Sequence, residues 1–286
     1  DQMLLADQER TLPDNMLAFL EMGASALAEA GKIRARLGAA PGGSPHVYSE
    51  SDIELCAPVP RPGKIMHTSC NFGSHLADLT KWEAPEWQSH NWGSFHFEHP
   101  TGFLEAPSSV SAPGAKVAVP HFTRQLDYEI EIAIVIGKRA FRVPVDKAMD
   151  YVAGYTIFND LSARDIQARE HANKVILLGK SFDGSCPFGP HLVTADELSD
   201  PHNLDMKLRV NGVVRQNSNT AQMHYKTREL VSWWSNITLE PGDIITSGSP
   251  PGVAAGMKNP EWLKPGDQVD ASIAELGTLT TFIVAG

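Results

Sequence analysis

The stretch DYEIEIAIVIG, residues 127–137, followed by YTIFNDLSARD, residues 155–165, decides the fold of this chain. Isoleucine recurs at every second position from Ile130 to Ile136, and Gly137 ends the run. This period of two predicts a buried β-strand. Glu129 and Glu131 lie two positions apart, on the face of the strand opposite the isoleucines, and their side chains therefore point the same way.

Two carboxylates side by side on an apolar strand repel each other, and each loses hydration on burial. We therefore expect a cation to hold them. Asp160 follows a second apolar run and could bring a third carboxylate to the same place. Three carboxylates with few nitrogen or sulfur competitors suit a hard divalent ion, so we predict that Glu129, Glu131 and Asp160 bind Mg²⁺ or Mn²⁺, with Ca²⁺ as a further option.

A simpler interpretation of the same residues needs no metal. Glu-x-Glu pairs occur on the solvent face of many edge strands, and Asp160 could be the N-cap of a helix that starts at Leu161. The surrounding sequence decides between the two interpretations. DYEIEIAIVIGK, FNDLSARD, GKSFDGSCPFGP and SGSPPGV occur here in the order found in the fumarylacetoacetate hydrolase family, which the chain resembles from Lys64 to its C-terminus.

The pattern of elements predicts a β-rich α+β protein, and the resemblance implies a mixed β-sheet roll with peripheral helices, assembled as a homodimer. We expect a small N-terminal region over residues 1–63 and the catalytic domain over 64–286. A helix is predicted from Asp14 to Leu37, a short strand from Lys64 to Ser69, and a loop or lid from Trp82 to Pro100. Asn-Gly at 211–212 predicts a type I′ hairpin, and residues 227–234 predict a short helix.

Composition limits the partners. The 286 residues are 42% hydrophobic and carry a net charge of −10, which argues against nucleic acid and membrane surfaces as partners. No apolar run approaches the roughly 20 residues that span a bilayer. The three cysteines form no C-x-x-C pair, which favours free thiols and a cytoplasmic location. An anionic substrate would therefore need a local attraction, such as a metal ion or a lysine.

His75 and Asp78 lie three residues apart and would share a face of a helix, where a carboxylate can orient a histidine as general base. A bare H-x-x-D is more often a surface pair. Here it resembles the family phrase N-Y-x-x-H-x-x-E, whose histidine and acid form the catalytic dyad. The chain has Phe72 for the tyrosine and Asp78 for the glutamate, and aspartate reaches one methylene less far.

The resemblance implies further site residues. Lys180 would contact oxygen atoms at the metal, with Asp183 in support; a surface salt bridge between the two is the alternative. Ser247, Gly248 and Ser249 align with the family phrase T-G-T, which holds the substrate carboxylate. The family often has lysine in F-L-K-P, where this chain has Glu105, which puts one anion contact in doubt. Two further candidates for substrate binding follow Asp160 on the presumed helix and could instead face solvent: Arg164 and Gln167.

The predicted function is metal-dependent hydrolysis of a carbon–carbon bond in a small anionic β-diketo acid. The substrate would be of the acylpyruvate, fumarylpyruvate or maleylpyruvate type, and the products pyruvate and a carboxylic acid, in aromatic or sugar-acid catabolism. His75 and Asp78 would activate a water, and Lys180 with the metal would stabilise the enolate. Alternatives with the same metal site are an oxaloacetate decarboxylase and a hydroxymuconate isomerase; a non-catalytic protein of this fold is a further one.

Overall fold

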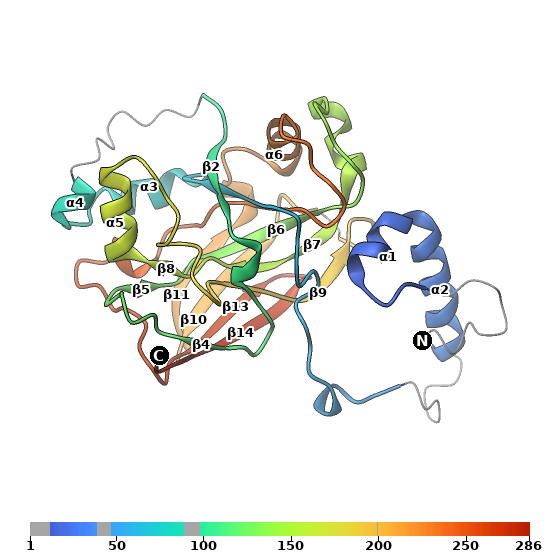
Figure 1. Ribbon diagram of the computed structural model, residues 1–286, viewed down its shortest axis with the longest axis horizontal. Coiled ribbons are helices and arrows are strands. Elements are labelled where there is room, and N and C mark those ends of the chain that lie inside the picture. Colours follow the sequence, from blue (N-terminus) through green and yellow to red (C-terminus); the bar gives the residue numbers. More distant parts are fainter. Residues whose placement is uncertain (1–11, 39–46, 89–97, 199) are drawn as a thin grey trace.

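The computed structural model of the protein describes residues 12–38, 47–88, 98–198 and 200–286 (Figure 1). Its largest element is a seven-stranded sheet. The strands lie in the order β2 (Thr101–Glu105), β1 (Ile65–Ser69), β12 (Ile244–Thr246), β6 (Ile130–Ile136), β7 (Val152–Asn159), β9 (Cys186–Thr194) and β3 (Val110–Ser111). β1 pairs with β12, and β3 with β9, in parallel, while the other neighbours are antiparallel, so the sheet is mixed.

A second sheet packs against the first. Its five strands are β11 (Val213–Asn219), β10 (Asp205–Val210), β13 (Gln268–Ile273), β14 (Gly277–Val284) and β4 (Lys116–Ala118). Contacts of β10, β13 and β14 with β6, β7 and β9 bring the two sheets together around the main hydrophobic core. A short third sheet pairs β5 (Leu126–Asp127) with β8 (Ser162–Ala163). The predicted fold class, a mixed β-sheet roll with peripheral helices, is confirmed.

The helices lie around the sheets. Figure 1 shows α1 (Met16–Met22) and α2 (Ala24–Gly38) at one end of the molecule, and α3 (Gly73–Leu79), α4 (Pro85–Gln88) and α5 (Arg164–Ala172) at the other. α6 (Thr227–Trp234) has the predicted bounds. Short 3-10 helices complete the described chain: η2 (Glu50–Asp52), η4 (Pro107–Ser109), η5 (Val145–Tyr151), η6 (Thr220–Gln222) and η7 (Ala254–Gly256). None of the helices in the described part is long and apolar enough to cross a membrane.

Two predicted elements differ in detail. The single helix predicted over 14–37 is interrupted at Gly23, which is the C-cap residue of α1. Its φ is +58°, and its backbone N–H donates to Leu20 O. The hairpin at Asn211-Gly212 is confirmed, because both residues have positive φ, as a type I′ turn requires. Of the predicted lid, Trp82 and Trp87 are buried, while residues 89–97 lie outside the described residues.

The large sheet presents two different faces. Met66 on β1 and Ile132 and Ile134 on β6 point into the main core between the sheets. On the other face, Ala133 and Val135 of β6 join a second apolar cluster that α1 covers through Leu20. Because side chains alternate along a strand, Glu131 and Glu129 continue this second face beyond the cluster. The strand that the sequence predicted therefore lies in the middle of the sheet and not at an edge.

Candidate active site

The three acidic residues predicted to bind a metal converge at one end of the second face. The register of β6 and β7 pairs Ile130 with Asn159, and the backbone N–H of Asp160 donates to Glu129 O at 2.8 Å. One ligand oxygen from each of Glu129, Glu131 and Asp160 lies within 4.8 Å of the others, and all three side chains are buried. The alternative of a solvent-facing pair on an edge strand is wrong.

The alternative role for Asp160 fails as well. The helix after it, α5, begins at Arg164 with Ala163 as its N-cap. Ser162 and Ala163 form β8 instead, and Asp160 lies between the two strands β7 and β8. Asp160 is thus free of a capping role and contributes its carboxylate to the acidic cluster.

Lys180 supplies a positive charge to this cluster. Its side chain is 2% exposed, and Nζ donates to Glu129 Oε2 at 2.5 Å, to Ser162 Oγ at 2.7 Å and to Asp160 Oδ2. Burial works against the charged form, but Asp160 and Glu129 outweigh it and raise the pKa of Lys180, which keeps the side chain an ammonium. Asp183 is exposed, so the predicted support from Asp183 is not seen, nor is the alternative surface salt bridge.

Arg164 and Gln167 are buried, so the alternative that they face solvent is wrong for both. Arg164 donates from Nε to Asp127 Oδ2 at 2.8 Å and from a terminal nitrogen to Glu129 Oε1 at 2.6 Å. A second terminal nitrogen donates to Gln167 Oε1 at 2.9 Å. Burial alone would raise the pKa of Glu129, but Arg164 and Lys180 lower it well below its usual range.

Some oxygens of the acidic cluster have no protein donor. Glu131 accepts the backbone N–H of Gly248 through Oε2 at 2.8 Å, but within the described part of the chain neither its Oε1 nor Asp160 Oδ1 makes a hydrogen bond. Burial, as the leading cause, raises the pKa of Glu131. A buried carboxylate oxygen without a donor is costly, and a divalent cation would satisfy it. Glu129, Glu131 and Asp160 therefore fit the divalent metal that the sequence predicted.

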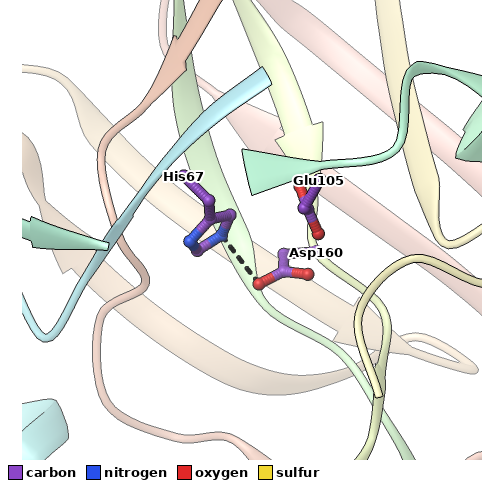
Figure 2. Close-up of side chains that lie close together, drawn as sticks. All are labelled: His67, Glu105 and Asp160. Atoms are coloured by element: carbon purple, nitrogen blue, oxygen red, sulfur yellow. Dashed lines mark ion pairs between the residues drawn. The ribbon is translucent and has the colours of Figure 1, made fainter. Parts of the chain in front are cut away.

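The structure adds two residues that the sequence analysis did not assign to the site, His67 and Glu105. β1 and β2 pair antiparallel with His67 opposite Phe103, and the two rings stack with centroids 4.5 Å apart. His67 Nε2 lies 2.7 Å from Asp160 Oδ2 and 3.3 Å from Glu131 Oε1. Figure 2 shows His67 and Glu105 reaching toward Asp160. Two features of the sequence could have indicated these residues. Side chains alternate along the predicted strand 64–69, which contains His67, and Glu105 stands where the family often has lysine.

His75 enters the site without Asp78. The His75 ring is buried; its Nε2 lies 3.4 Å from Glu129 Oε1, and none of the described residues forms a hydrogen bond with its Nδ1. Asp78 instead accepts from Lys81 at 3.0 Å on the outside of α3. The predicted hydrogen bond between His75 and Asp78 is therefore not formed, and the Asp78 carboxylate pairs instead with Lys81, two residues past the end of α3.

The segment 247–249 forms hydrogen bonds to β6 and to Glu131, and most of it does not line the cavity. Ser247 Oγ accepts the N–H of Ile132 at 3.1 Å and donates to Gly248 O, while the Gly248 N–H is bound to Glu131. Only Ser249 of the three lines the cavity. The substrate contacts predicted for Ser247 and Gly248 are thus replaced by contacts that position Glu131.

A cavity of about 200 Å³ opens beside these groups. The titratable or polar side chains on its wall include His67, His75, Glu129, Glu131, Arg164, Gln167, Lys180 and Ser249, and the apolar ones include Trp87 and Phe103. Cys70 also lines it, but burial, with Glu129 nearby, raises the pKa of its thiol to about 12, so it is not a thiolate nucleophile at neutral pH. Cationic side chains and hydrogen-bond donors thus lie on the wall of the cavity beside the acidic cluster.

Comparison with known proteins identifies the family. Residues 64–284 match the sequence model described as "Fumarylacetoacetate (FAA) hydrolase C-terminal". An oxaloacetate tautomerase from Xenopus laevis, named as mitochondrial, is 41% identical over 275 residues, which cover 96% of this chain and 80% of the relative. That name gives the cytoplasmic expectation no support.

Two solved structures share the fold. A 5-carboxymethyl-2-hydroxymuconate delta-isomerase from Mycobacterium smegmatis is 31% identical with a TM-score of 0.69, and the match covers 84% of each chain. A maleylpyruvate hydrolase from Sphingobium sp. SYK-6 is 27% identical with a TM-score of 0.71, covering 95% of this chain and 86% of the other. Proteins similar to this chain thus carry names of three reaction classes: tautomerase, isomerase and hydrolase.

Proposed function

Because the chain belongs to the fumarylacetoacetate hydrolase family, we propose that it is an enzyme that interconverts the enol and keto forms of oxaloacetate or of a closely similar 2-oxo dicarboxylic acid. The observation that carries this proposal is the 41% identity to an oxaloacetate tautomerase over nearly the whole chain. The predicted carbon–carbon hydrolysis becomes the second candidate.

The chemistry of tautomerisation suits the groups in the cavity. The O–H bond of the enol breaks, a C–H bond forms at the neighbouring carbon, and the double bond moves from C=C to C=O. No water is consumed, so no oriented base for water is needed. The missing contact between His75 and Asp78 supports this choice, because without Asp78 nothing among the described residues orients His75 through Nδ1 toward a water.

The side chains divide into two roles. His75 lines the cavity with one nitrogen free, and we assign it to proton transfer between the enol oxygen and the carbon. Lys180 lies at the acidic cluster as a fixed cation and stabilises negative charge on the substrate oxygen. A divalent ion held by Glu129, Glu131 and Asp160 would add Lewis-acid stabilisation of the same charge. Mg²⁺ and Mn²⁺ both suit these three carboxylates.

Hydrolysis of an acylpyruvate-type substrate has one observation in its favour besides the similarity to a maleylpyruvate hydrolase: a buried histidine stands at the acidic cluster. The decarboxylase and the hydroxymuconate isomerase use the same stabilised enolate. The four reactions differ in their products, because only hydrolysis adds water, only decarboxylation releases CO₂, and the two isomerisations conserve every atom of the substrate.

An assay of products separates these reactions. Purified protein with Mn²⁺ or Mg²⁺ is given enol oxaloacetate, acetylpyruvate, maleylpyruvate and a hydroxymuconate in turn, and products are identified by chromatography. The proposal predicts fast loss of the enol absorbance of oxaloacetate without pyruvate or CO₂, with Glu131→Gln in the same buffer and metal as the inactive control. Pyruvate formed from acetylpyruvate or maleylpyruvate at a higher kcat/KM would show that the enzyme is a hydrolase.

A further inference from the structure

His67, Glu105 and Asp160 form a second cluster of possible ligands beside the first (Figure 2). One ligand atom from each lies within 4.8 Å of the others, and all three residues are buried. We propose that this cluster binds a second divalent cation, with Asp160 shared between the two ions. The proposal deepens the proposed function, on which it rests through the first metal site.

The strongest observation is the state of Glu105. Its side chain is 2% exposed, and neither carboxylate oxygen has a hydrogen-bond partner among the residues that the structure describes. An ionised carboxylate buried without a donor or a counter-ion costs several kcal/mol. Glu105 is held there by the register of β2 on β1, which places it opposite Ile65 and on the same face as His67. The pairing of β2 with β1 thus fixes a buried carboxyl group whose oxygens no described residue binds.

The other two ligands are also incompletely bonded. Neither ring nitrogen of His67 makes a hydrogen bond of regular geometry, although Nε2 lies 2.7 Å from Asp160 Oδ2. Asp160 Oδ1 has no donor. Free atoms on all three residues therefore face one region. Ligand atoms around one divalent ion lie at most about 4 to 4.5 Å apart, so small side-chain shifts would complete the coordination.

The mixed ligand set suggests which ion binds. One imidazole nitrogen with two carboxylates favours a transition ion such as Mn²⁺ over Mg²⁺, which prefers an all-oxygen site. Asp160 would bridge this ion and the one held by Glu129 and Glu131, as a shared carboxylate does in two-metal enzymes, where the ions lie about 3.5–4 Å apart. The His67 ring stacks on Phe103, and this contact restricts the orientation of the imidazole.

Charge supports the same conclusion. Five carboxyl groups are buried around the site, from Asp127, Glu129, Glu131, Asp160 and Glu105, against two cationic side chains, from Arg164 and Lys180. With these groups ionised and His67 neutral, as a histidine that binds a metal must be, the site carries an excess of three negative charges. One divalent ion would still leave a negative site for a dianionic substrate, whereas two ions would make it positive.

The competing explanation is that Glu105 and Asp160 share a proton. Burial, followed by the charge of Asp160, raises the pKa of Glu105, so a neutral Glu105 would also relieve the repulsion. The two explanations differ in what they predict for metal binding. A shared proton leaves one ion per chain, while the second site requires two.

The test counts Mn²⁺. Protein stripped with a chelator is titrated with Mn²⁺, bound metal is measured by elemental analysis after gel filtration, and the electron paramagnetic resonance spectrum is recorded at each step. We expect two ions per wild-type chain and a loss of signal intensity as the second ion binds, because two Mn²⁺ ions bridged by one carboxylate couple magnetically. One ion per chain at saturation would overturn the proposal, whether or not the protein turns over oxaloacetate.

Variants assign the second ion. Glu105→Gln should bind one ion with an uncoupled spectrum, and His67→Asn provides the same test should Glu105→Gln fail to fold. Glu240→Gln, at an exposed glutamate paired with Arg139, is the matched control and should keep two. Two ions in both site variants would overturn the assignment to this cluster. Because the readout is a metal count, failure of the second site is distinguished from failure of the proposed tautomerase activity.

Discussion

Replacing Lys180 by methionine tests the electrostatic balance of the site. The ammonium is buried and bonded to Glu129, Asp160 and Ser162, and removing one partner of such a pair costs about 3–5 kcal/mol of unfolding free energy. We expect that loss in the presence of a chelator. A divalent ion held by Glu129, Glu131 and Asp160 would share two of these carboxylates with Lys180 and would be repelled by its charge. The variant should therefore bind Mn²⁺ at least tenfold more tightly than wild type, which corresponds to about 1.4 kcal/mol.

The assay for this variant is urea unfolding with chelator and with excess Mn²⁺, combined with calorimetric titration of Mn²⁺. The gap in unfolding free energy between wild type and Lys180→Met should narrow by at least about 1.4 kcal/mol when Mn²⁺ is added, while turnover stays low. Lys81→Met, at a lysine whose side chain is 69% exposed, is the control and should change stability by less than about 0.5 kcal/mol. Weaker Mn²⁺ binding by Lys180→Met, with an unchanged gap, would refute the competition between Lys180 and the metal.

Three further predictions follow from single contacts. His75→Gln should lower kcat by about 10²- to 10⁴-fold with metal binding retained. Asp78→Asn should keep kcat within about threefold. Equal losses of kcat in the two variants would show that the two residues act as a catalytic dyad. Gly248→Ala should destabilise the protein by about 1–3 kcal/mol in urea, because its φ is +79° and a Cβ would lie 2.9 Å from Thr68 O; unchanged stability would refute this strain. Burial opposes ionisation of Asp267, but hydrogen bonds to its carboxylate outweigh burial and lower its pKa. The unfolding free energy lost in Asp267→Ala should therefore be largest at neutral pH and shrink below about pH 4. A loss that does not depend on pH would contradict this prediction.

The sequence predicts the acidic cluster well, because its geometry is local. A period of two places Glu129 and Glu131 on one face, and the next apolar run ends just before Asp160, so pairing of the two strands brings all three together. The type I′ hairpin is equally local, since Asn-Gly tolerates positive φ at both central positions.

Sequence reasoning missed one part of the site that depends on long-range packing and others that depend on which local partner takes a polar group. His67 reaches Asp160 only because β1 lies two strands away from β6 in the same sheet, with β12 between them. No local pattern shows that order. Asp78 was assigned to His75 by spacing along a helix, and spacing alone does not show that Lys81 takes the carboxylate instead. Ser247 and Gly248 were assigned to the substrate, but their donors are used by the protein itself.

The proposed reaction moves a proton on a 2-oxo dicarboxylic acid and leaves the carbon skeleton intact. The most direct measurement follows oxaloacetate by NMR in D₂O with Mg²⁺ and a catalytic amount of protein, against Glu131→Gln under the same conditions. We expect rapid deuterium incorporation at the carbon beside the keto group, far above the control rate, with no more pyruvate than the control forms. Deuterium exchange at the control rate, or pyruvate accumulating in step with turnover, would contradict it.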